Sequence, residues 1–566
     1  MKITNYAVRH IQDLRDMLRQ SAELYSEHAA FLWKNGTSEY APITTRQFKE
    51  EVEALGTALW DMGYGGKRIV VTGENGYPWA LSYMSTVCGL GVVVPVDKEI
   101  NKEEMENIIQ LSEAALILHA SSVTEKLADL PADKISFDQL PEFVERGKAL
   151  LKEGKKDYLT APIDPEALAS LIFTSGTTGV SKGVMLSQKN ICHNLMHMCQ
   201  MIYIDDTDTF LSILPLHHVY ECTCGFLCQI YRGSTIAYCE GLRHITKNMQ
   251  EAGVTKVCAV PVLIESMYKR IWAQAEKSGR AAALRKGIKI NGILKKFHID
   301  LSKKLFKEIH ATFGGKLKLM IAGGASIDPA ILAGMRDLGI LAVQGYGLSE
   351  CAPIAAVNRD TFYNDSAAGL CMPDCELEVV NIKEDGTGDI RYKGENVMLG
   401  YYKAPELTAE VLPGDGWFYT GDIGYLDRDG FLHITGRKKN VIVTSNGKNI
   451  FPEELEAYLA KNPLVQESVI VGIKNERKKD YDIVAAVVPN MDKFKELFGE
   501  EATPALIQEK LEAAVSEVNK QVQGYKHMDV TLVRYEEFPK NTSKKIKRYG
   551  LEELLMDDYR EKTMKL

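Results

Sequence analysis

Residues 171–187 read LIFTSGTTGVSKGVMLS, an apolar strand followed by a loop of hydroxyl side chains, glycines and one lysine. Glycines let the backbone turn tightly and bring its N–H groups close to phosphate oxygens, while hydroxyls donate further hydrogen bonds. The glycines are Gly176, Gly179 and Gly183, and the donors and the cation are Thr174, Ser175, Thr177, Thr178 and Lys182. This composition predicts a triphosphate-binding loop at the end of a buried strand.

The loop differs from the common nucleotide motif G-x-x-x-x-G-K-[ST]. Lys182 is followed by glycine, and its spacing from Gly176 is wrong for that motif. A surface turn rich in serine and glycine is the alternative interpretation. We favour the phosphate loop because so many of these residues follow directly on an apolar strand.

Composition limits the classes of protein that fit. The 566 residues are too many for one core of ordinary size, which predicts a large body with at least one further domain. A formal net charge of -8 argues against a nucleic-acid partner. The charged N-terminus is unlike a signal peptide, no apolar run is long enough to span a bilayer, and the 11 cysteines lack paired C-x-x-C spacing. We therefore expect a cytoplasmic protein, with at most peripheral membrane contact.

Short apolar runs alternate with helical stretches along the first two thirds of the chain. An early helix follows a cap at Thr44 or Thr45, with an apolar stripe from Phe48 to Met62. This alternation predicts an α/β fold with mainly parallel sheets and flanking helices, whose loops at the strand ends bind ligands. The predicted strands are RIVVTGEN (68–75), GVVVPVD (91–97), ALILHA (115–120), SLIFTSG (170–176), FLSILPL (210–216), STIAYCE (234–240), KVCAVP (256–261) and KLMIAGG (318–324).

The pattern changes after about residue 380. Short strands with a hairpin at Asp429-Gly430 predict a small β-rich subdomain. Beyond Arg437, two helices (452–461 and about 505–522) and two strands (467–473 and 483–488) predict a compact α+β unit. We expect an N-terminal domain over residues 1–436 and a small mobile C-terminal domain over residues 437–566.

The phosphate loop resembles the signature loop of the adenylate-forming superfamily, which includes acyl-CoA synthetases, luciferases and the adenylation domains of peptide synthetases. Further motifs recur in that family's order as far as Lys545, so the resemblance covers most of the chain. It implies that LPLHHVYE (214–221) carries the family's histidine, His218, near the substrate carboxylate. Without the resemblance, a buried histidine pair would be interpreted as structural.

Two strand-then-glycine segments, IAGGASID (321–328) and VQGYGLSECAP (343–353), resemble the family's adenine walls. Glycine lets a flat base approach the backbone. The resemblance implies that Tyr346 stacks on the base, Ser349 contacts the α-phosphate and Glu350 holds Mg²⁺, a hard cation that prefers oxygen ligands. Most relatives have threonine where this chain has Ser349. The residues implied to line the base are Gly323, Gly324, Ala325, Gly345, Tyr346 and Gly347.

The remaining implied site residues lie towards the C-terminus. In the family's pattern, Asp422 is the ribose ligand and Arg437 its companion, and Lys439 is the hinge about which the C-terminal domain rotates. Gly447 would line the thiol channel of coenzyme A. The segment FPKNTSKKIKR (538–548) aligns Lys545 with the catalytic lysine, although Asn541 and Lys544 replace a threonine and a glycine of the usual pattern. The alternative is that Lys544 makes the contact.

The resemblance implies an ATP-dependent acyl-CoA synthetase that uses ATP, Mg²⁺ and coenzyme A and acts on a carboxylic acid. The lysine-rich end favours a long-chain fatty acid, as in bacterial long-chain fatty acid–CoA ligases. A medium-chain or aryl acid, transfer to a carrier protein, and a luciferase-like oxygenase remain alternatives, and we expect a monomer or homodimer. Two other patterns are interpreted as packing: the cluster Cys192, His193, His197 and Cys199, and an amphipathic helix from Leu301 to Phe313.

Overall fold

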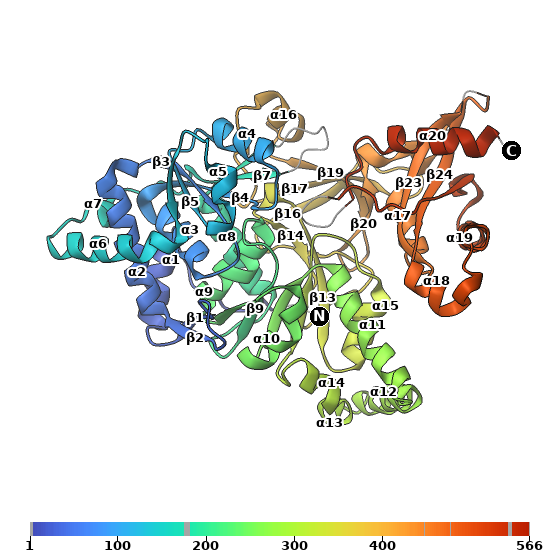
Figure 1. Cartoon of the computed structure of the whole chain (residues 1–566), viewed down its shortest axis with the longest axis horizontal. Coiled ribbons are helices and arrows are strands. Elements are labelled where there is room, and N and C mark those ends of the chain that lie inside the picture. Colours follow the sequence, from blue (N-terminus) through green and yellow to red (C-terminus); the bar gives the residue numbers. More distant parts are fainter. Residues whose placement is uncertain (1–3, 175–181, 446–447, 476, 541–545, 565–566) are drawn as a thin grey trace.

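The computed structural model describes residues 4–174, 182–445, 448–475, 477–540 and 546–564. It is a mixed α/β structure with a large, sheet-rich N-terminal part and a smaller C-terminal part at one end (Figure 1). In the described part of the chain, no helix is both long and apolar enough to cross a membrane.

One sheet of the N-terminal part has seven strands in the order β18-β8-β7-β4-β3-β5-β6. Its five central and outer strands, from β7 to β6, run parallel, and β8 and β18 are antiparallel additions at the other edge. The strands are β3 (Lys67–Thr72), β4 (Gly91–Val96), β5 (Leu116–His119), β6 (Asp133–Ser136), β7 (Leu168–Thr174), β8 (Lys182–Ser187) and β18 (Gly400–Tyr401).

The second sheet has thirteen strands in the order β16-β17-β19-β20-β15-β14-β13-β12-β11-β9-β10-β1-β2. Its parallel strands are β1 (Ala29–Trp33), β9 (Thr209–Ser212), β10 (Thr235–Tyr238), β11 (Lys256–Ala259), β12 (Leu319–Ala322) and β13 (Leu341–Gly347), and β2 (Ala41–Thr44) pairs antiparallel at the edge. The eight strands predicted from the sequence are all present.

The predicted β-rich subdomain is an antiparallel continuation of this second sheet, joined through β13 and β14. It begins at Ile354, earlier than the change of pattern near residue 380 indicated, because β14 follows β13 after a short turn. Its strands are β14 (Ile354–Val357), β15 (Gly369–Cys371), β16 (Glu376–Val380), β17 (Gly388–Lys393), β19 (Phe418–Leu426) and β20 (Phe431–Arg437).

Helices cover both sheets, and α8 packs against β7 and β8 of one sheet and β14 of the other. The largest apolar cluster fills the space around α2 and α8, and it contains the predicted Cys192 and Cys199, both buried. The longer helices are α1 (Leu14–Leu24), α2 (Thr45–Leu59), α3 (Tyr77–Ser85), α4 (Lys102–Ser112), α6 (Leu140–Lys152), α8 (Gln188–Met201), α10 (Ile245–Ala252), α11 (Pro261–Lys277), α12 (Ala281–Lys295) and α15 (Pro329–Asp337).

Helix α2 confirms the predicted cap and most of its stripe. The Thr44 hydroxyl accepts a hydrogen bond from the backbone N–H of Gln47 at 3.1 Å, and the apolar side chains from Phe48 to Leu59 are buried. Met62 was placed on this stripe wrongly. The helix changes to a π-helical turn at Trp60, which leaves Met62 exposed.

The single helix expected from Leu301 to Phe313 is also wrong. Two short helices, α13 (Ser302–Leu305) and α14 (Lys307–Thr312), are separated at Phe306, whose φ of -113° is not helical. The break turns the Phe306 side chain inward and leaves Leu305 exposed, so the apolar side chains do not form one continuous stripe.

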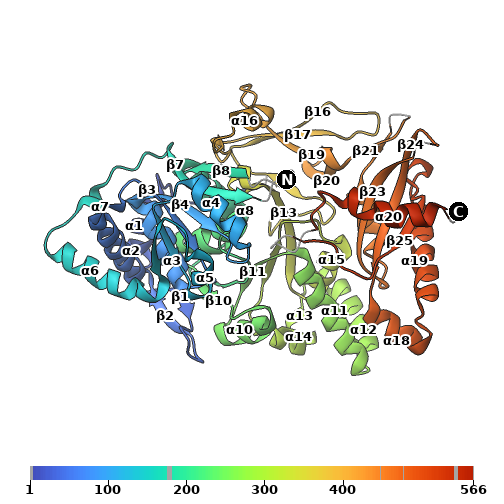
Figure 2. The ribbon, with the colours of Figure 1, turned by 45° about the horizontal axis from the view of Figure 1, so that its top comes forward.

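The C-terminal part is an α+β unit with its own apolar cores on the two faces of the sheet β23-β24-β25 (Figure 2). The predicted helices and strands are α17 (Pro452–Leu459), β23 (Val465–Asn475), β24 (Asp480–Pro489) and α19 (Pro504–Asn519). The sequence interpretation missed α18 (Met491–Phe498), β25 (Val530–Val533) and α20 (Leu551–Met564), together with the short pair β21 (Ile442–Val443) and β22 (Asn449–Ile450).

Candidate active site

The two strands that flank the predicted phosphate loop form an antiparallel pair. Thr174 ends β7 directly opposite Lys182, which begins β8. The ammonium group of Lys182 lies 5.1 Å from the centre of the Tyr401 ring, a cation–π contact. The predicted loop residues Ser175, Gly176, Thr177 and Thr178 lie outside the described residues.

Tyr401 also contacts Glu350. The Tyr401 hydroxyl donates a hydrogen bond to Oε1 of Glu350 at 2.8 Å, and burial together with this carboxylate raises the pKa of Tyr401. The Glu350 carbonyl accepts a bond from the Met398 N–H, also at 2.8 Å. Tyr401 was not singled out from the sequence, and it now links the predicted metal ligand to the predicted phosphate lysine.

Asp422, Tyr346 and Arg437 form a second polar group. Asp422 and Arg437 face each other across β19 and β20, and Nε of Arg437 lies 3.1 Å from the Asp422 carboxylate. The Tyr346 hydroxyl donates to Oδ2 of Asp422 at 2.6 Å. Burial raises the pKa of Asp422, and the charge of Arg437 opposes that rise. A buried carboxylate held by one hydrogen bond and one ion pair is pre-oriented to accept hydroxyl hydrogens from a ligand.

Lys439 reaches the same place from the short helical turn 438–440. Desolvation of its ammonium group, together with the positive charges of Arg437 and Lys182, lowers the pKa of Lys439 to about 8. The negative charges of Asp422 and Glu350 raise the pKa of Lys439 and so oppose this effect. Three cations and two carboxylates, drawn from both sheets and from the predicted hinge, therefore surround one small volume. Such concentrated positive charge suits a polyphosphate.

The predicted adenine walls lie at the ends of β12 and β13. A side chain at Gly347 would come within 2.0 Å of the Pro353 carbonyl, so glycine is required where the end of β13 approaches the segment that leads into β14. A side chain at Gly323 would come within 2.7 Å of the Tyr220 ring. Tyr220 donates to the Ile321 carbonyl at 2.9 Å and was missed in the sequence, where it stands two residues after His218.

The remaining wall residues are arranged around these two glycines. Gly324 has a φ of +85°, which favours glycine, and Ala325 beside it is exposed. Gly345 is half-buried against Val357, and Ser349 begins a short helical turn that also contains Glu350.

The histidine motif lies at the junction between the polar groups and a large cavity. His218 lines the cavity, while His217 turns to Asp97, with 3.4 Å between Nε2 and the carboxylate. Glu221, on the same wall, is completely buried, which raises the pKa of its carboxyl group to about 8. Glu221 is therefore mainly uncharged at pH 7.

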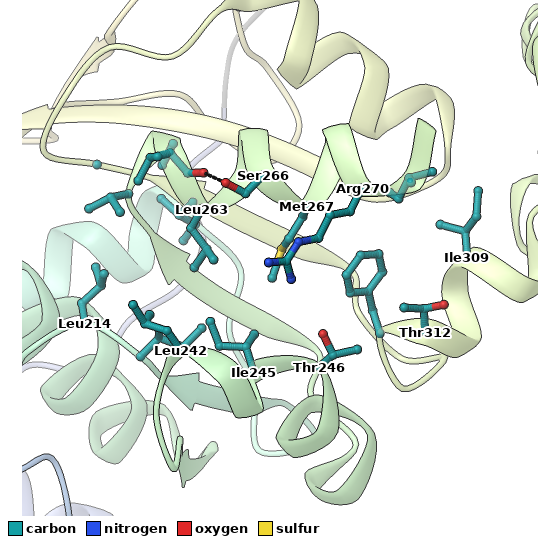
Figure 3. Close-up of a pocket in the computed structure, with 18 of the residues that line it drawn as sticks. Leu214, Leu242, Ile245, Thr246, Leu263, Ser266, Met267, Arg270, Ile309 and Thr312 are labelled. Atoms are coloured by element: carbon teal, nitrogen blue, oxygen red, sulfur yellow. Dashed lines mark hydrogen bonds between the residues drawn. The ribbon is translucent and has the colours of Figure 1, made fainter. Parts of the chain in front are cut away.

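The cavity has a volume of about 1860 Å³ and is continuous from the glycine walls to a chamber among α10, α11, α12 and α14. The nucleotide end includes Gly323, Gly324, Gly345, Gly347 and Ser349. Figure 3 shows the chamber, where apolar side chains from α10 and α11 face each other and Arg270 extends between them. The labelled chamber residues are Leu214, Leu242, Ile245, Thr246, Leu263, Ser266, Met267, Arg270, Ile309 and Thr312.

Two predicted residues of the C-terminal part, Gly447 and Lys545, lie outside the described residues, as does Lys544. Of the histidine and cysteine cluster set aside as packing, His197 bonds to the His193 carbonyl at 2.6 Å and to Asp374 at 3.0 Å. Burial, with the nearby His197, lowers the pKa of His193 to about 4.

Comparison with known proteins gives matches to two family models and to curated relatives. The family model described as AMP-binding enzyme matches residues 18–402, and the model of the AMP-binding enzyme C-terminal domain matches residues 439–559. The long-chain-fatty-acid–CoA ligase of Escherichia coli O6:H1 is 27% identical over 95% of this chain and 94% of its own. Long-chain-fatty-acid–CoA ligase 1 of Homo sapiens is 29% identical over 80% of this chain and 70% of its own.

The fold is shared with solved structures. ATP-bound MatB from Rhodopseudomonas palustris superposes with a TM-score of 0.76, covering 97% of this chain and 100% of its own at 21% identity. Since the first family model spans more than half of the chain, the protein belongs to the AMP-binding enzyme family, the adenylate-forming superfamily that its motifs resemble.

Proposed function

We propose that the protein is an ATP-dependent acyl-CoA synthetase for long-chain fatty acids. The observation that carries this proposal is the continuous cavity, which joins the glycine walls of the proposed nucleotide site to an apolar chamber. At about 1860 Å³ it exceeds the roughly 300–1000 Å³ that accommodates one ordinary ligand. The names of the curated relatives, long-chain-fatty-acid–CoA ligases, support the same acid class.

In the first step the substrate carboxylate attacks the α-phosphate of ATP, and pyrophosphate leaves. Asp422 accepts the ribose hydroxyl hydrogens, with Tyr346 and Arg437 holding its carboxylate in place. Lys182 and Lys439 stabilise the negative charge that develops on phosphate oxygens. His218 orients the carboxylate where the cavity passes from polar to apolar surroundings. Ser349 contacts the α-phosphate.

Glu350 fits a magnesium ligand. Within the described residues its carboxylate accepts one hydrogen bond, from Tyr401, and carboxylate oxygens suit a hard divalent cation. Bound Mg²⁺ would neutralise charge on the phosphate oxygens. Tyr401 fixes the orientation of Glu350 and also contacts Lys182, so it positions both groups.

In the second step the thiol of coenzyme A attacks the acyl-adenylate and AMP leaves. We propose that the chain divides at residues 437–439, that Lys439 is a hinge, and that Gly447 borders the thiol path. Lys545 would serve the first step only, approaching the phosphates from the mobile C-terminal domain. The two separate apolar cores of the C-terminal part support its movement as one unit.

One experiment distinguishes long-chain acids from other acids, and free coenzyme A from a carrier protein as the acceptor. We would measure AMP release with free coenzyme A for saturated acids of 4 to about 20 carbons, benzoate, and a carrier protein as acceptor. The proposal expects the highest kcat/KM for acids of about 14 carbons or more, because each buried methylene contributes about 0.8 kcal/mol. A maximum at medium chains or benzoate would contradict the long-chain assignment, and turnover only with the carrier protein would contradict free coenzyme A.

A further inference from the structure

The side chains that line the large cavity carry an excess of positive charge. Among the described residues there are two lining glutamates, Glu221 and Glu308. Glu308 pairs with Arg280, and Glu221 is mainly uncharged at pH 7 because burial raises its pKa to about 8. The lining is therefore cationic, which favours an anionic ligand. The lining lysines and arginines are Arg243, Arg270, Lys277, Arg280, Lys304 and Lys307.

Arg270 lies among the apolar side chains of the chamber. It shares one face of α11 with Leu263 and Met267, because residues three and four positions apart lie on the same side of a helix. Figure 3 shows the Arg270 side chain extending from α11 into the chamber, towards the apolar side chains around α10. Arg270 is exposed, so its guanidinium group is accessible from the cavity.

No carboxylate neutralises Arg270 within the described part of the chain. The Arg270 side chain makes no ion pair or hydrogen bond with any described residue. Glu265, on the same helix, pairs with Lys269 at 3.9 Å, and Glu308 pairs with Arg280. A methyl-ended hydrocarbon chain in the chamber would remove water from this cation without providing a partner, which costs free energy.

Thr246 provides a second polar group on a different helix. Ser266 and Thr312 also reach the chamber, but their hydroxyls donate to the carbonyl oxygens of Val262 at 2.6 Å and Glu308 at 3.0 Å. The Thr246 hydroxyl, on α10, makes no hydrogen bond with any residue that the structure describes. This hydroxyl and the guanidinium group on α11 are therefore two donors that a ligand in the chamber can use.

We propose that the chamber binds acids with a second carboxylate at the far end of the chain, and that Arg270 and Thr246 hold this carboxylate. The guanidinium group presents parallel N–H donors that match the two oxygens of a carboxylate. The first carboxylate would lie near His218, and the hydrocarbon between the two would pack against the apolar walls. The inference rests on the proposed function and names its substrate more closely, as a long-chain α,ω-dicarboxylic acid.

Steering of ordinary fatty acids is the other role that a cation in this place could serve. A positive lining raises the local concentration of any carboxylate. Steering acts on the carboxylate that monocarboxylic and dicarboxylic acids share, whereas binding of a distal carboxylate acts on the dicarboxylic acid alone. The ratio of the two values of kcat/KM therefore separates the two roles.

The test measures kcat/KM for AMP release with coenzyme A, using monocarboxylic and α,ω-dicarboxylic acids of equal length. At the best length the dicarboxylic acid should be preferred by roughly tenfold or more, the scale of a hydrogen bond to a charged group. A ratio of one or less at every length would overturn the proposal. A stronger preference for ω-hydroxy acids would also overturn it, because their distal group carries no charge.

Arg270→Met removes the charge and keeps a long side chain. It should lower kcat/KM for the dicarboxylic acid at least roughly tenfold more than kcat/KM for the monocarboxylic acid. Thr246→Val should have a smaller effect in the same direction. Arg270→Glu should instead favour ω-amino acids, whose distal ammonium group matches a carboxylate. Equal losses with both classes of acid in Arg270→Met would overturn the assignment and indicate steering.

The matched control is Lys269→Met, which removes a cation one residue earlier on α11. Lys269 is exposed, pairs with Glu265 and does not line the cavity. The control should change the preference by less than about twofold, because an exposed ion pair contributes little. An equal loss of preference in the control would overturn the proposal, since the total charge of α11 would then be responsible.

Binding without ATP separates failure of the inference from failure of the proposed function. Titration calorimetry should show tighter binding of dodecanedioate than of laurate, and Arg270→Met should remove the difference. A chain that binds dodecanedioate in this way but activates no acid would contradict the proposed function and leave the distal carboxylate site supported. A chain that activates palmitate and shows no preference for dicarboxylic acids would overturn the inference and leave the proposed function standing.

Discussion

In the proposed mechanism, Lys545 serves adenylation and not acyl transfer. Lys545→Ala should reduce acyl-AMP formation by several hundredfold or more, because removing one charge-stabilising donor costs roughly 10²–10³ in rate. Thioester formation from pre-made acyl-adenylate should remain. Pyrophosphate exchange and acyl transfer measure the two steps. Equal loss in both would make Lys545 structural, and the same pattern in Lys544→Ala instead would shift the alignment by one residue.

Substituting glutamine for Glu350 tests the proposed metal site with almost no change in side-chain volume. Glu350→Gln should raise the Mg²⁺ concentration needed for half-maximal turnover by more than about tenfold. A loss of roughly tenfold is expected when a residue that only hydrogen-bonds to a metal ligand is changed, and Glu350 is the proposed ligand itself. The free energy of unfolding should change by less than about 1 kcal/mol, since the amide oxygen can still accept the hydrogen bond from the Tyr401 hydroxyl. A Mg²⁺ titration and thermal melting separate the two effects, and unchanged metal dependence would disprove the assignment.

At the scale of elements, two helical glycines should respond in opposite directions to the same change. A side chain at Gly147 of α6 would meet the Ala54 carbonyl of α2 at 1.8 Å, so Gly147→Ala should destabilise by about 1–3 kcal/mol. Gly292 of α12 has open space, and Gly292→Ala should stabilise by roughly 0.5–1 kcal/mol. Urea unfolding of both variants measures this, and similar effects in both would contradict the packing of α6 on α2.

The elements also show what sequence patterns can predict. The parallel strands were predictable because each is a short apolar run ended by turn residues, as in β3, β4 and β12. The break at Phe306 was not, because a periodic stripe does not reveal that one ring packs into a distant glycine, Gly287.

Within the candidate site, the sequence motifs predicted strand segments that the structure brings together, such as those carrying Tyr346 and Asp422. Tyr220 and Tyr401 were not predicted from the sequence because their roles depend on contacts with residues that are distant in the chain. Tyr220 fills the space that Gly323 leaves, and Tyr401 reaches Glu350 from an edge strand 51 positions further along the chain. The position of a tyrosine in the sequence does not distinguish such contacts from ordinary packing.

At the scale of the whole molecule, two large sheets make up the N-terminal part, while the C-terminal part has its own sheet and its own apolar cores. Lys439→Pro should therefore restrict how the second part turns against the first, because proline fixes φ near about -65°. Loss of the ammonium group should slow adenylation equally in this variant and in Lys439→Ala, whereas thioester formation should fall roughly a further hundredfold in the proline variant alone, about 3 kcal/mol of barrier. Pyrophosphate exchange and acyl-CoA production on one preparation measure both steps.

The matched control for the proline variant is Lys439→Ala, which removes the ammonium group and leaves the backbone free. It should slow thioester formation far less than proline does. If the proline variant makes acyl-CoA at the normal rate, rotation about this residue is not required.

The cations near Lys439 lower its pKa, so nucleotide binding should be accompanied by proton uptake. With a pKa of about 8, Lys439 is half protonated at pH 8. A bound polyphosphate adds negative charge and raises this pKa, so binding at pH 8 should draw about half a proton from the buffer, and almost none at pH 6. Titration calorimetry in two buffers of different ionisation enthalpy measures the uptake, which Lys439→Arg should abolish. Equal heats in both buffers at pH 8 would show that Lys439 does not titrate with the nucleotide.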